Sequence, residues 1–460
     1  MSSSFFNPAR FPVLSGLTLF FLALVVESTL PDCQAQAIET KRDSILAELK
    51  PVLENEFGLF YPLCIDSVYG GYLSDVNYKW QLDGWQTKMI VTQARHVWSL
   101  STGSVFYKKR EPFLNYAHHG LEFLKNVMWD KEHGGFYDLV TRDGKPISFG
   151  YGPAGKTAYG NGFAIYGLSA YYKAFGDTAA LNLAIRTFEW LDEHSYDPKY
   201  GGYFQNLLTN GDPQKDWYEG VPPKDQNSMI HLMEAFTELY GVWPNKILRQ
   251  RLDMLFHEVR DTVVGNKGYM TLFFNRNWEP VTYRDSSEQS RRSHFELDHI
   301  SFGHDVETAY LLLETSKALG LKDDTTTVRI AKELDDFALA YGWDNEKGGI
   351  YDGSYWFKDS TRPTVVLKTK EWWSQIEGLN SFLMISQLYP HDPNNYFQKF
   401  CEQWNFIENY VIDHKNGGWY WGGIDEAPNV KLGPKASIWK CNYHTTRGLE
   451  NCVRRLEGDN

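Results

Sequence analysis

The stretch Asp197-Pro198-Lys199-Tyr200-Gly201-Gly202-Tyr203 contains a pattern that recurs along the chain: an Asp, three variable residues, two glycines and a bulky apolar residue. The other intact copies are Asp66 to Tyr72, Asp130 to Phe136, Asp344 to Ile350 and Asp413 to Trp419. A worn copy, Asn266-Lys267-Gly268-Tyr269, falls in the gap where a sixth is needed. The copies lie roughly 65 to 80 residues apart, and a fixed period indicates a repeat architecture. The paired glycines predict tight hairpin turns, because such turns need positive φ.

Between the turn strings the apolar residues recur with the 3.6-residue period of helices. The pattern predicts twelve helices, near residues 40–57, 87–103, 109–128, 158–175, 178–195, 226–242, 246–264, 304–320, 324–342, 371–388, 393–413 and 440–456. They form six pairs, with one turn string after the first member of each pair. We therefore expect an all-α fold, an (α/α)6 barrel with short β-hairpins on one rim and the second helix of each pair inside. All inner helices then begin at that rim, where helix N-termini offer unpaired N–H groups to a polar, hydroxyl-rich ligand.

The composition is that of one large folded domain. Of the 460 residues, 42% are hydrophobic and 16% aromatic, and no Pro/Ser-rich linker interrupts the repeat, so we expect a single catalytic barrel domain over 38–460. A formal net charge of −12 disfavours a nucleic-acid partner, which needs a basic surface. The sequence has no Gly-rich phosphate loop, Rossmann fingerprint or His-Glu-x-x-His motif, so no cofactor is expected. It does not predict the oligomeric state.

Residues 1–37 are predicted to be a secretory signal peptide. Arg10 precedes an apolar run, 13–26, that is too short to span a membrane, and Ala35-Gln36-Ala37 is a small-residue cleavage site. We therefore expect export to the periplasm or the medium, with no membrane attachment after cleavage. A lipoprotein anchored through Cys33 is the less favoured alternative, because Pro31 and Asp32 stand where small residues are usual.

Candidate functional residues gather at the starts of the predicted inner helices. In chain order they are Arg95, Tyr159, Asn227, His231, His304, Glu307, Trp372, Trp373, Glu377, Trp439 and His444. One such residue alone is more often structural, but three starts that each carry a histidine favour a site. Imidazoles suit proton transfer near neutral pH, a guanidinium suits a developing oxyanion, and exposed indoles suit the apolar faces of pyranose rings. A metal bound by the three histidines is disfavoured, because Arg95 beside them would oppose a cation.

These residues resemble the N-acylglucosamine 2-epimerase superfamily, and within it most the cellobiose 2-epimerases. The resemblance covers essentially the whole mature chain. Its most specific parts are the stretches 227–235, 303–307, 371–377 and 439–444. It implies an (α/α)6 barrel and a cofactor-free inversion at C2 of a reducing-end aldose, and we expect the substrate to be a disaccharide, cellobiose or the mannobiose equivalent.

The resemblance also implies roles for the candidate residues. His304 and His444 match two acid/base histidines on opposite faces of the sugar, and His231 matches a third that assists ring opening. Arg95 matches an arginine near the C1 and C2 oxygens, and Glu307 a carboxylate that orients its neighbours. The residues implied to contact the sugar are Tyr159, Asn227, Trp372, Trp373, Glu377 and Trp439.

Two further features set this chain apart from the family pattern. Gln93 stands two residues before Arg95, where cellobiose epimerases tend to carry Asn. The segment 276–298 looks longer than in the simplest members, and we expect it to form a lid that influences which sugar fits.

Three other functions remain open at this point. An N-acylglucosamine 2-epimerase or an aldose–ketose isomerase acting on a monosaccharide could use the same histidines. A glycoside hydrolase would need two carboxylates around a scissile bond, for which Asp305 and Glu307 are candidates. A non-catalytic sugar-binding protein would keep the tryptophans but would not need three histidines.

Overall fold

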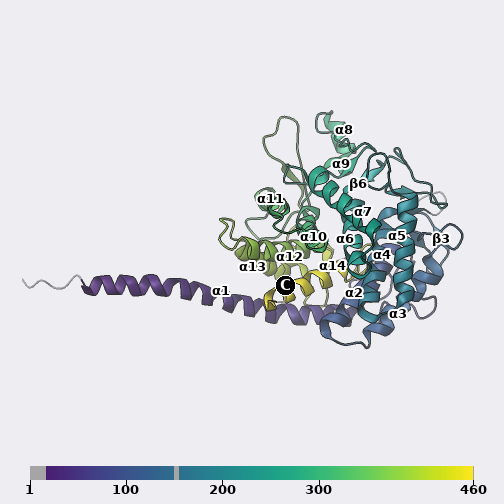
Figure 1. Ribbon diagram of the computed structural model, residues 1–460. Coiled ribbons are helices and arrows are strands. Elements are labelled where there is room, and N and C mark those ends of the chain that lie inside the picture. Colours follow the sequence, from purple (N-terminus) through teal and green to yellow (C-terminus); the bar gives the residue numbers. More distant parts are fainter. Residues whose placement is uncertain (1–16, 150–154, 459–460) are drawn as a thin grey trace, which may run out of the picture. The chain divides into compact units, whose positions relative to one another are not determined.

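The computed structural model describes residues 17–149 and 155–458 (Figure 1), and the side chains from residue 38. It divides into two units, Met1–Leu49 and Lys50–Asn460, which are described separately. The first unit contains the beginning of α1 (Leu17–Phe60). Of the predicted signal peptide, residues 1–16 lie outside the described residues and 17–37 lie in α1 without described side chains, so the signal peptide stays a prediction. Among the described residues, no helix combines the length and apolar character that a membrane crossing requires.

In the second unit, six inner helices form a closed ring. They are α2 (Ile90–Tyr107), α4 (Ala158–Phe175), α6 (Gln226–Val242), α10 (Phe302–Leu319), α12 (Trp372–Leu388) and α14 (Tyr443–Glu457). Each packs against the next, and α14 packs against α2. Most of their residues are buried, which places these second members of each pair inside, as predicted.

The outer helices carry one apolar stripe each and expose the opposite face. After residues 50–60 of α1 they are α3 (Phe113–Phe123), α5 (Thr178–His194), α7 (Lys246–His257), α11 (Thr325–Tyr341) and α13 (Tyr396–Phe406). Three of them continue into π-helical turns, η1 (Leu124–Met128), η2 (Glu258–Val264) and η3 (Ile407–Val411). All twelve predicted helices are present, and the prediction of an (α/α)6 barrel is confirmed.

Each intact turn string forms a small hairpin on the rim where the inner helices begin. In the third copy, Tyr196 pairs with Tyr203, and the Asp197 carbonyl accepts the N–H of Gly201. Gly201 and Gly202 have φ of 74° and 69°, a backbone conformation that favours glycine. A Cβ on Gly202 would also lie 2.5 Å from the Trp278 ring. Both glycines are therefore required by the turn.

A buried lysine connects each intact hairpin to the inner helix that follows. The pairs are Asp66–Lys88, Asp130–Lys156, Asp197–Lys224, Asp344–Lys370 and Asp413–Lys435, with N–O distances of 2.7–3.3 Å. The lysine side chains are at most 1% exposed. In the first four pairs the lysine stands two residues before its helix and also donates to the carbonyl of the first glycine. The turn string therefore fixes the place where an inner helix begins.

The worn fourth copy lacks this ion pair and closes differently from the prediction. Its hairpin is closed by the Thr271 N–H bonding to the Val263 carbonyl, and the turn between these two residues contains no Asp. Ile300 stands two residues before α10, where α2, α4, α6 and α12 have the lysine. The apolar residue of this copy is Met270 rather than Tyr269, because the Met270 N–H donates to Asp305 Oδ1 at 2.9 Å.

The bond from the Met270 N–H to Asp305 is one example of a second contact that recurs between hairpins and inner helices. The N–H of Tyr72 donates to Gln93, that of Phe136 to Asn161, and that of Ile350 to Gln375. Gln93 is therefore a structural residue that binds the first hairpin, which explains the departure noticed near Arg95. Asp305 has the same structural role in the worn copy.

Short antiparallel sheets connect neighbouring hairpins around the rim. They are β1 (Lys88–Met89) with β2 (Leu139–Val140) and β3 (Pro146–Ile147), β4 (Lys156–Thr157) with β5 (Asn206–Leu207), β6 (Lys224–Asp225) with β7 (Phe273–Phe274), and β8 (Ile300–Ser301) with β9 (Gly353–Tyr355) and β10 (Thr364–Leu367). The long segment before β8 folds into α8 (Glu288–Ser293) and α9 (Phe295–Asp298). A 3-10 turn, η4 (Pro428–Leu432), precedes α14.

Loss of one buried lysine should destabilise the whole barrel. We expect Lys156→Met to lower the free energy of unfolding by about 3–5 kcal/mol, because it leaves the Asp130 carboxylate buried without its cation. Lys173→Met removes an exposed pair with Glu238 and should cost less than about 1 kcal/mol. Urea denaturation of both variants tests this, and equal losses would contradict the importance of the buried pair.

Candidate active site

Three histidines meet at the rim where the inner helices begin, and each ring is held through Nδ1. His231 Nδ1 lies 2.8 Å from Glu234 Oε2, and His444 Nδ1 lies 2.6 Å from Glu377 Oε1. His304 Nδ1 lies 2.7 Å from the hydroxyl of Ser301, the residue before α10. Because Nδ1 carries the structural bond in each ring, Nε2 is the nitrogen left for a ligand. A carboxylate at Nδ1 also selects the Nδ1–H tautomer, whose Nε2 has a free lone pair.

One indole contacts two of these histidines. The centroid of the Trp373 ring is 4.7 Å from that of His304 and 5.7 Å from that of His444. Trp373 is only half-buried, so part of its face remains open at the rim. Both histidines therefore border the same indole.

Arg95 is buried close to the same space. Its guanidinium lies over the rings of Phe163 and Tyr443, at 4.3 and 4.8 Å, and Nη2 donates to the Tyr159 hydroxyl at 3.1 Å. Its Nε has no hydrogen-bond partner among the described residues. Asn227 Oδ1, on the first turn of α6, likewise has no partner within the described part of the chain. Both groups can therefore bind a ligand's oxygen or hydroxyl.

Beneath the histidines lies a buried ionic network that the sequence analysis missed. Arg447, 3% exposed, contacts the carboxylates of Glu234, Glu307 and Glu377. Two of these carboxylates are the Nδ1 partners of His231 and His444. A signal was present in the sequence, because Glu234, Glu307 and Arg447 each follow a site histidine by three residues and so share its helix face. Arg447 therefore aligns the supports of the histidines.

Glu377 differs from its prediction as a sugar contact. It is fully buried, and its two oxygens bind the Tyr310 hydroxyl, His444 Nδ1 and Arg447. Those bonds occupy the carboxylate. Glu377 is thus a positioning residue for His444.

The predicted tryptophans fall into different environments. Trp372, which the resemblance implies to contact the sugar, is 3% exposed and packs against the Trp421 ring at 4.8 Å. Consecutive helix residues point in different directions, and Trp373 is the more exposed of the two. Trp439 is 45% exposed and stacks on Phe149 at 6.1 Å, so it is available to a sugar ring.

Burial and charge keep two of the histidines neutral at neutral pH. Burial lowers the pKa of His304 to about 4, with Glu307 opposing this shift. Burial and the guanidinium of Arg95 lower the pKa of His444 well below its usual value. In the network, burial opposes ionisation of Glu234, but Arg447 and His231 outweigh it and lower that pKa to about 2. A neutral imidazole is suited to accept a proton.

One group of potential metal ligands lies within the site. Donor atoms of Glu307, Glu377 and His444 lie within 4.8 Å of one another. Arg447, however, contacts both carboxylates and already supplies the positive charge. The arrangement therefore favours a guanidinium over a metal ion at this position.

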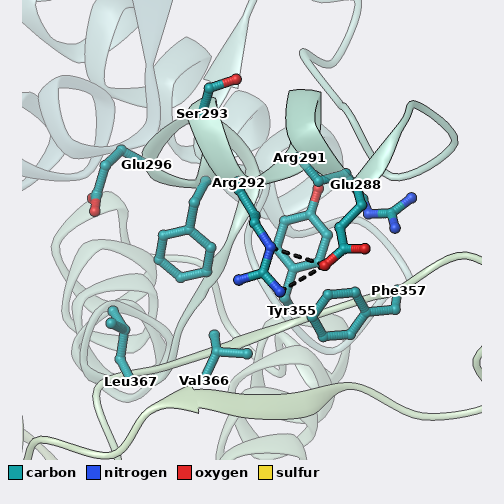
Figure 2. Close-up of a pocket in the computed structure, with 10 residues that line it drawn as sticks. Glu288, Arg291, Arg292, Ser293, Glu296, Tyr355, Phe357, Val366 and Leu367 are labelled. Carbon is teal, nitrogen blue, oxygen red and sulfur yellow. Dashed lines mark hydrogen bonds and ion pairs between the residues drawn. The ribbon is translucent and has the colours of Figure 1, made fainter.

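A hollow of about 380 Å³ lies in the long segment before α10 rather than among the histidines. Figure 2 shows Arg292 of α8 bonded to Glu288, with the Tyr355 ring beside them and Val366 and Leu367 below. None of the predicted site residues lines this hollow. The predicted lid role of the segment stays a prediction.

Known proteins resemble the chain over nearly its whole length. Residues 71–447, which include all the predicted site residues, match the family model described as N-acylglucosamine 2-epimerase. A cellobiose 2-epimerase from Dictyoglomus turgidum is 27% identical over 418 residues, 89% of this chain and 98% of that protein. A D-mannose isomerase from Marinomonas mediterranea is 23% identical over 417 residues, 89% of this chain and 97% of that protein. The solved cellobiose 2-epimerase of Spirochaeta thermophila is 26% identical with a TM-score of 0.77, covering 91% of this chain and 98% of that one.

The lowered pKa of His304 predicts a stability loss in acid. Below the ordinary histidine pKa of about 6.5 the unfolded chain binds a proton that the folded ring refuses until pH falls to about 4. Stability should therefore decrease through this window as pH falls, by up to about 1.4 kcal/mol per pH unit for this group. Urea denaturation between these pH values should show a smaller decrease for His304→Asn than for the wild type. Identical slopes would contradict the assigned direction.

Proposed function

The chain belongs to the N-acylglucosamine 2-epimerase family and is a carbohydrate epimerase or isomerase, and we propose that it inverts C2 of the reducing-end aldose of a disaccharide. The observation that carries the proposal is the pair His304 and His444, which both lie against Trp373, each with Nε2 left for a ligand. The relatives named as cellobiose 2-epimerases support cellobiose, or the corresponding mannobiose, as the substrate. The partly exposed Trp439 is a surface on which the second sugar ring can lie.

The proposed reaction begins with opening of the sugar ring, assisted by His231. One of His304 and His444, neutral, removes the C2 proton, which the neighbouring carbonyl makes acidic. Arg95 stabilises the resulting enediolate oxygens. The other histidine must take up a proton from solvent when the sugar binds; it delivers that proton to the opposite face of C2, and the two rings thereby exchange protonation states. Two bases are needed, because a single base that returned its proton to the same face would restore the starting sugar.

An aldose–ketose isomerase is the second candidate. The D-mannose isomerase relative favours it, and both reactions pass through an enediolate. The outcome depends on whether C2 or C1 receives the proton. N-acylglucosamine remains an alternative substrate, since the family model carries that description.

The glycoside hydrolase alternative is poorly supported by the carboxylates. Asp305 binds the hairpin N–H of Met270, and burial raises its pKa well above the usual value. Glu307 contacts Arg447. A retaining or inverting hydrolase needs two carboxyl groups that face one glycosidic bond, and these two have other partners. A non-catalytic sugar-binding protein would not need imidazoles held through Nδ1 by buried groups.

We also propose that the protein is exported through residues 1–37, on the sequence evidence alone. N-terminal sequencing of the mature protein should find Ile38 as the first residue. A mature chain that begins at a lipidated Cys33 would instead support the lipoprotein alternative.

Product analysis in D₂O distinguishes the candidate functions. We expect incubation with cellobiose or mannobiose to give the 2-epimer with deuterium at C2, and NMR of the C2 position measures this product. A ketose product would indicate the isomerase, shortened chains the hydrolase, and binding without exchange the sugar-binding protein. Glucose and N-acetylglucosamine in parallel incubations test the monosaccharide alternatives.

Alanine at either acid/base histidine should abolish turnover without unfolding the barrel. We expect His304→Ala and His444→Ala each to retain less than a few percent of wild-type kcat, a loss of about 10²-fold or more. His118→Asn, on the outer helix α3, is the control and should keep wild-type activity. More than a few percent of activity in both alanine variants would refute the two-histidine mechanism.

A further inference from the structure

Glu371, the residue directly before α12, binds two indole N–H groups with one carboxylate. Its Oε2 accepts from Trp373 Nε1 at 2.8 Å, and its Oε1 accepts from Trp421 Nε1 at 3.2 Å. An indole has one N–H, so this bond fixes the rotation of the ring about its side-chain torsions. The Trp373 ring that is fixed in this way is the one that contacts both His304 and His444.

We propose that Glu371 is a positioning residue for C2 inversion, which holds the Trp373 indole against both histidines and so maintains their placement on opposite faces of the sugar. The inference rests on the proposed epimerase function. Within the described part of the chain Glu371 makes no hydrogen bond to a histidine, and it acts through Trp373. A two-base reaction is sensitive to this support, because both imidazoles must reach the same carbon from different sides.

The backbone of the segment 419–422 gives Glu371 a rigid anchor. Glu371 forms an antiparallel bridge with Gly422, and the Trp372 N–H donates to the Trp421 carbonyl at 3.0 Å. The buried Lys440 lies 4.8 Å from the Trp372 ring and donates to two carbonyls of the same segment at 2.9 Å each. Lys440 is also four residues before His444. The segment that holds Glu371 is therefore connected to the starts of both α12 and α14.

A carboxylate suits this position better than an amide. Hydrogen bonds to an ionised acceptor are roughly twice as strong as neutral ones, and both oxygens of Glu371 accept. Gln has one acceptor oxygen, and its NH₂ group would face the other indole N–H. Glu371→Gln therefore removes at least one of the two bonds while conserving side-chain size.

The test compares Glu371→Gln with Trp373→Phe, which deletes the indole N–H but keeps an aromatic ring. We expect each to lower kcat for epimerisation about 10- to 100-fold, the cost of one hydrogen bond to a charged group. The double variant should lose less than about twofold more, because both changes remove the same interaction. Trp421→Phe is the control and should stay within about twofold of the wild type. A loss in Trp421→Phe equal to that in Glu371→Gln would overturn the role of Trp373.

Two readouts separate positioning from a merely structural effect. In D₂O, the ratio of deuterium in recovered substrate to deuterium in epimer should rise in Glu371→Gln. The reason is that C2 of the enediolate is more often reprotonated on the face from which the proton was removed. This ratio is independent of the amount of folded enzyme. The indole resonance that is missing in Trp373→Phe should shift upfield in Glu371→Gln in ¹H–¹⁵N NMR. An unchanged ratio or an unchanged resonance would overturn the inference. A wild type that makes no epimer would refute the proposed function, while the resonance would still report the Glu371–Trp373 bond.

Discussion

A lysine ammonium and an aspartate carboxylate that are both removed from water stabilise a fold only if each finds its partner and its remaining hydrogen bonds are satisfied. Five such pairs stand around one rim of this barrel, and in four of them the lysine also binds a glycine carbonyl. Because the Asp belongs to a hairpin and, in four pairs, the Lys stands two residues before an inner helix, these four pairs connect a hairpin to the start of a helix. Arg95, His231 and Trp373 lie on helices that follow such a pair, whereas His304 lies on α10, which has none among the described residues. The positions of the first three therefore depend in part on charges outside the candidate site.

Inside the ring of inner helices, buried charges in the candidate site likewise need partners of opposite sign. Glu234, Glu307 and Glu377 converge on Arg447, and three buried carboxylates around one guanidinium leave negative charge to be balanced. The histidines above them can supply positive charge when they take up a proton. A base that becomes an imidazolium during a reaction thus finds a carboxylate already behind it, as His444 finds Glu377. Proton transfer and structural charge balance share the same groups.

The sequence predicted the fold well because its signals are local. Apolar periodicity marked all twelve helices, and the glycine pairs marked the hairpins, since both depend on residues a few positions apart. The site was predicted in its histidines but not in Arg447, whose partners Glu234 and Glu307 are 213 and 140 residues away. Trp372 and Glu377 were assigned to the sugar because spacing alone does not distinguish a residue at the surface of a helix start from one turned into the core. Met270 replaced Tyr269 in the worn hairpin because the backbone contact to Asp305 decides which residue completes the turn.

The worn repeat has a consequence for how such a barrel can diversify. At the other rim positions, lengthening the chain between hairpin and helix would risk separating two buried charges that stabilise the molecule only together. Before α10 no such buried Asp–Lys pair is present among the described residues, and there the chain carries α8, α9 and the hollow between them and β9–β10. A longer segment at this position separates no buried ion pair of this kind. The extra helices before His304 are therefore accommodated without loss of the pairs that hold the other hairpins to the barrel.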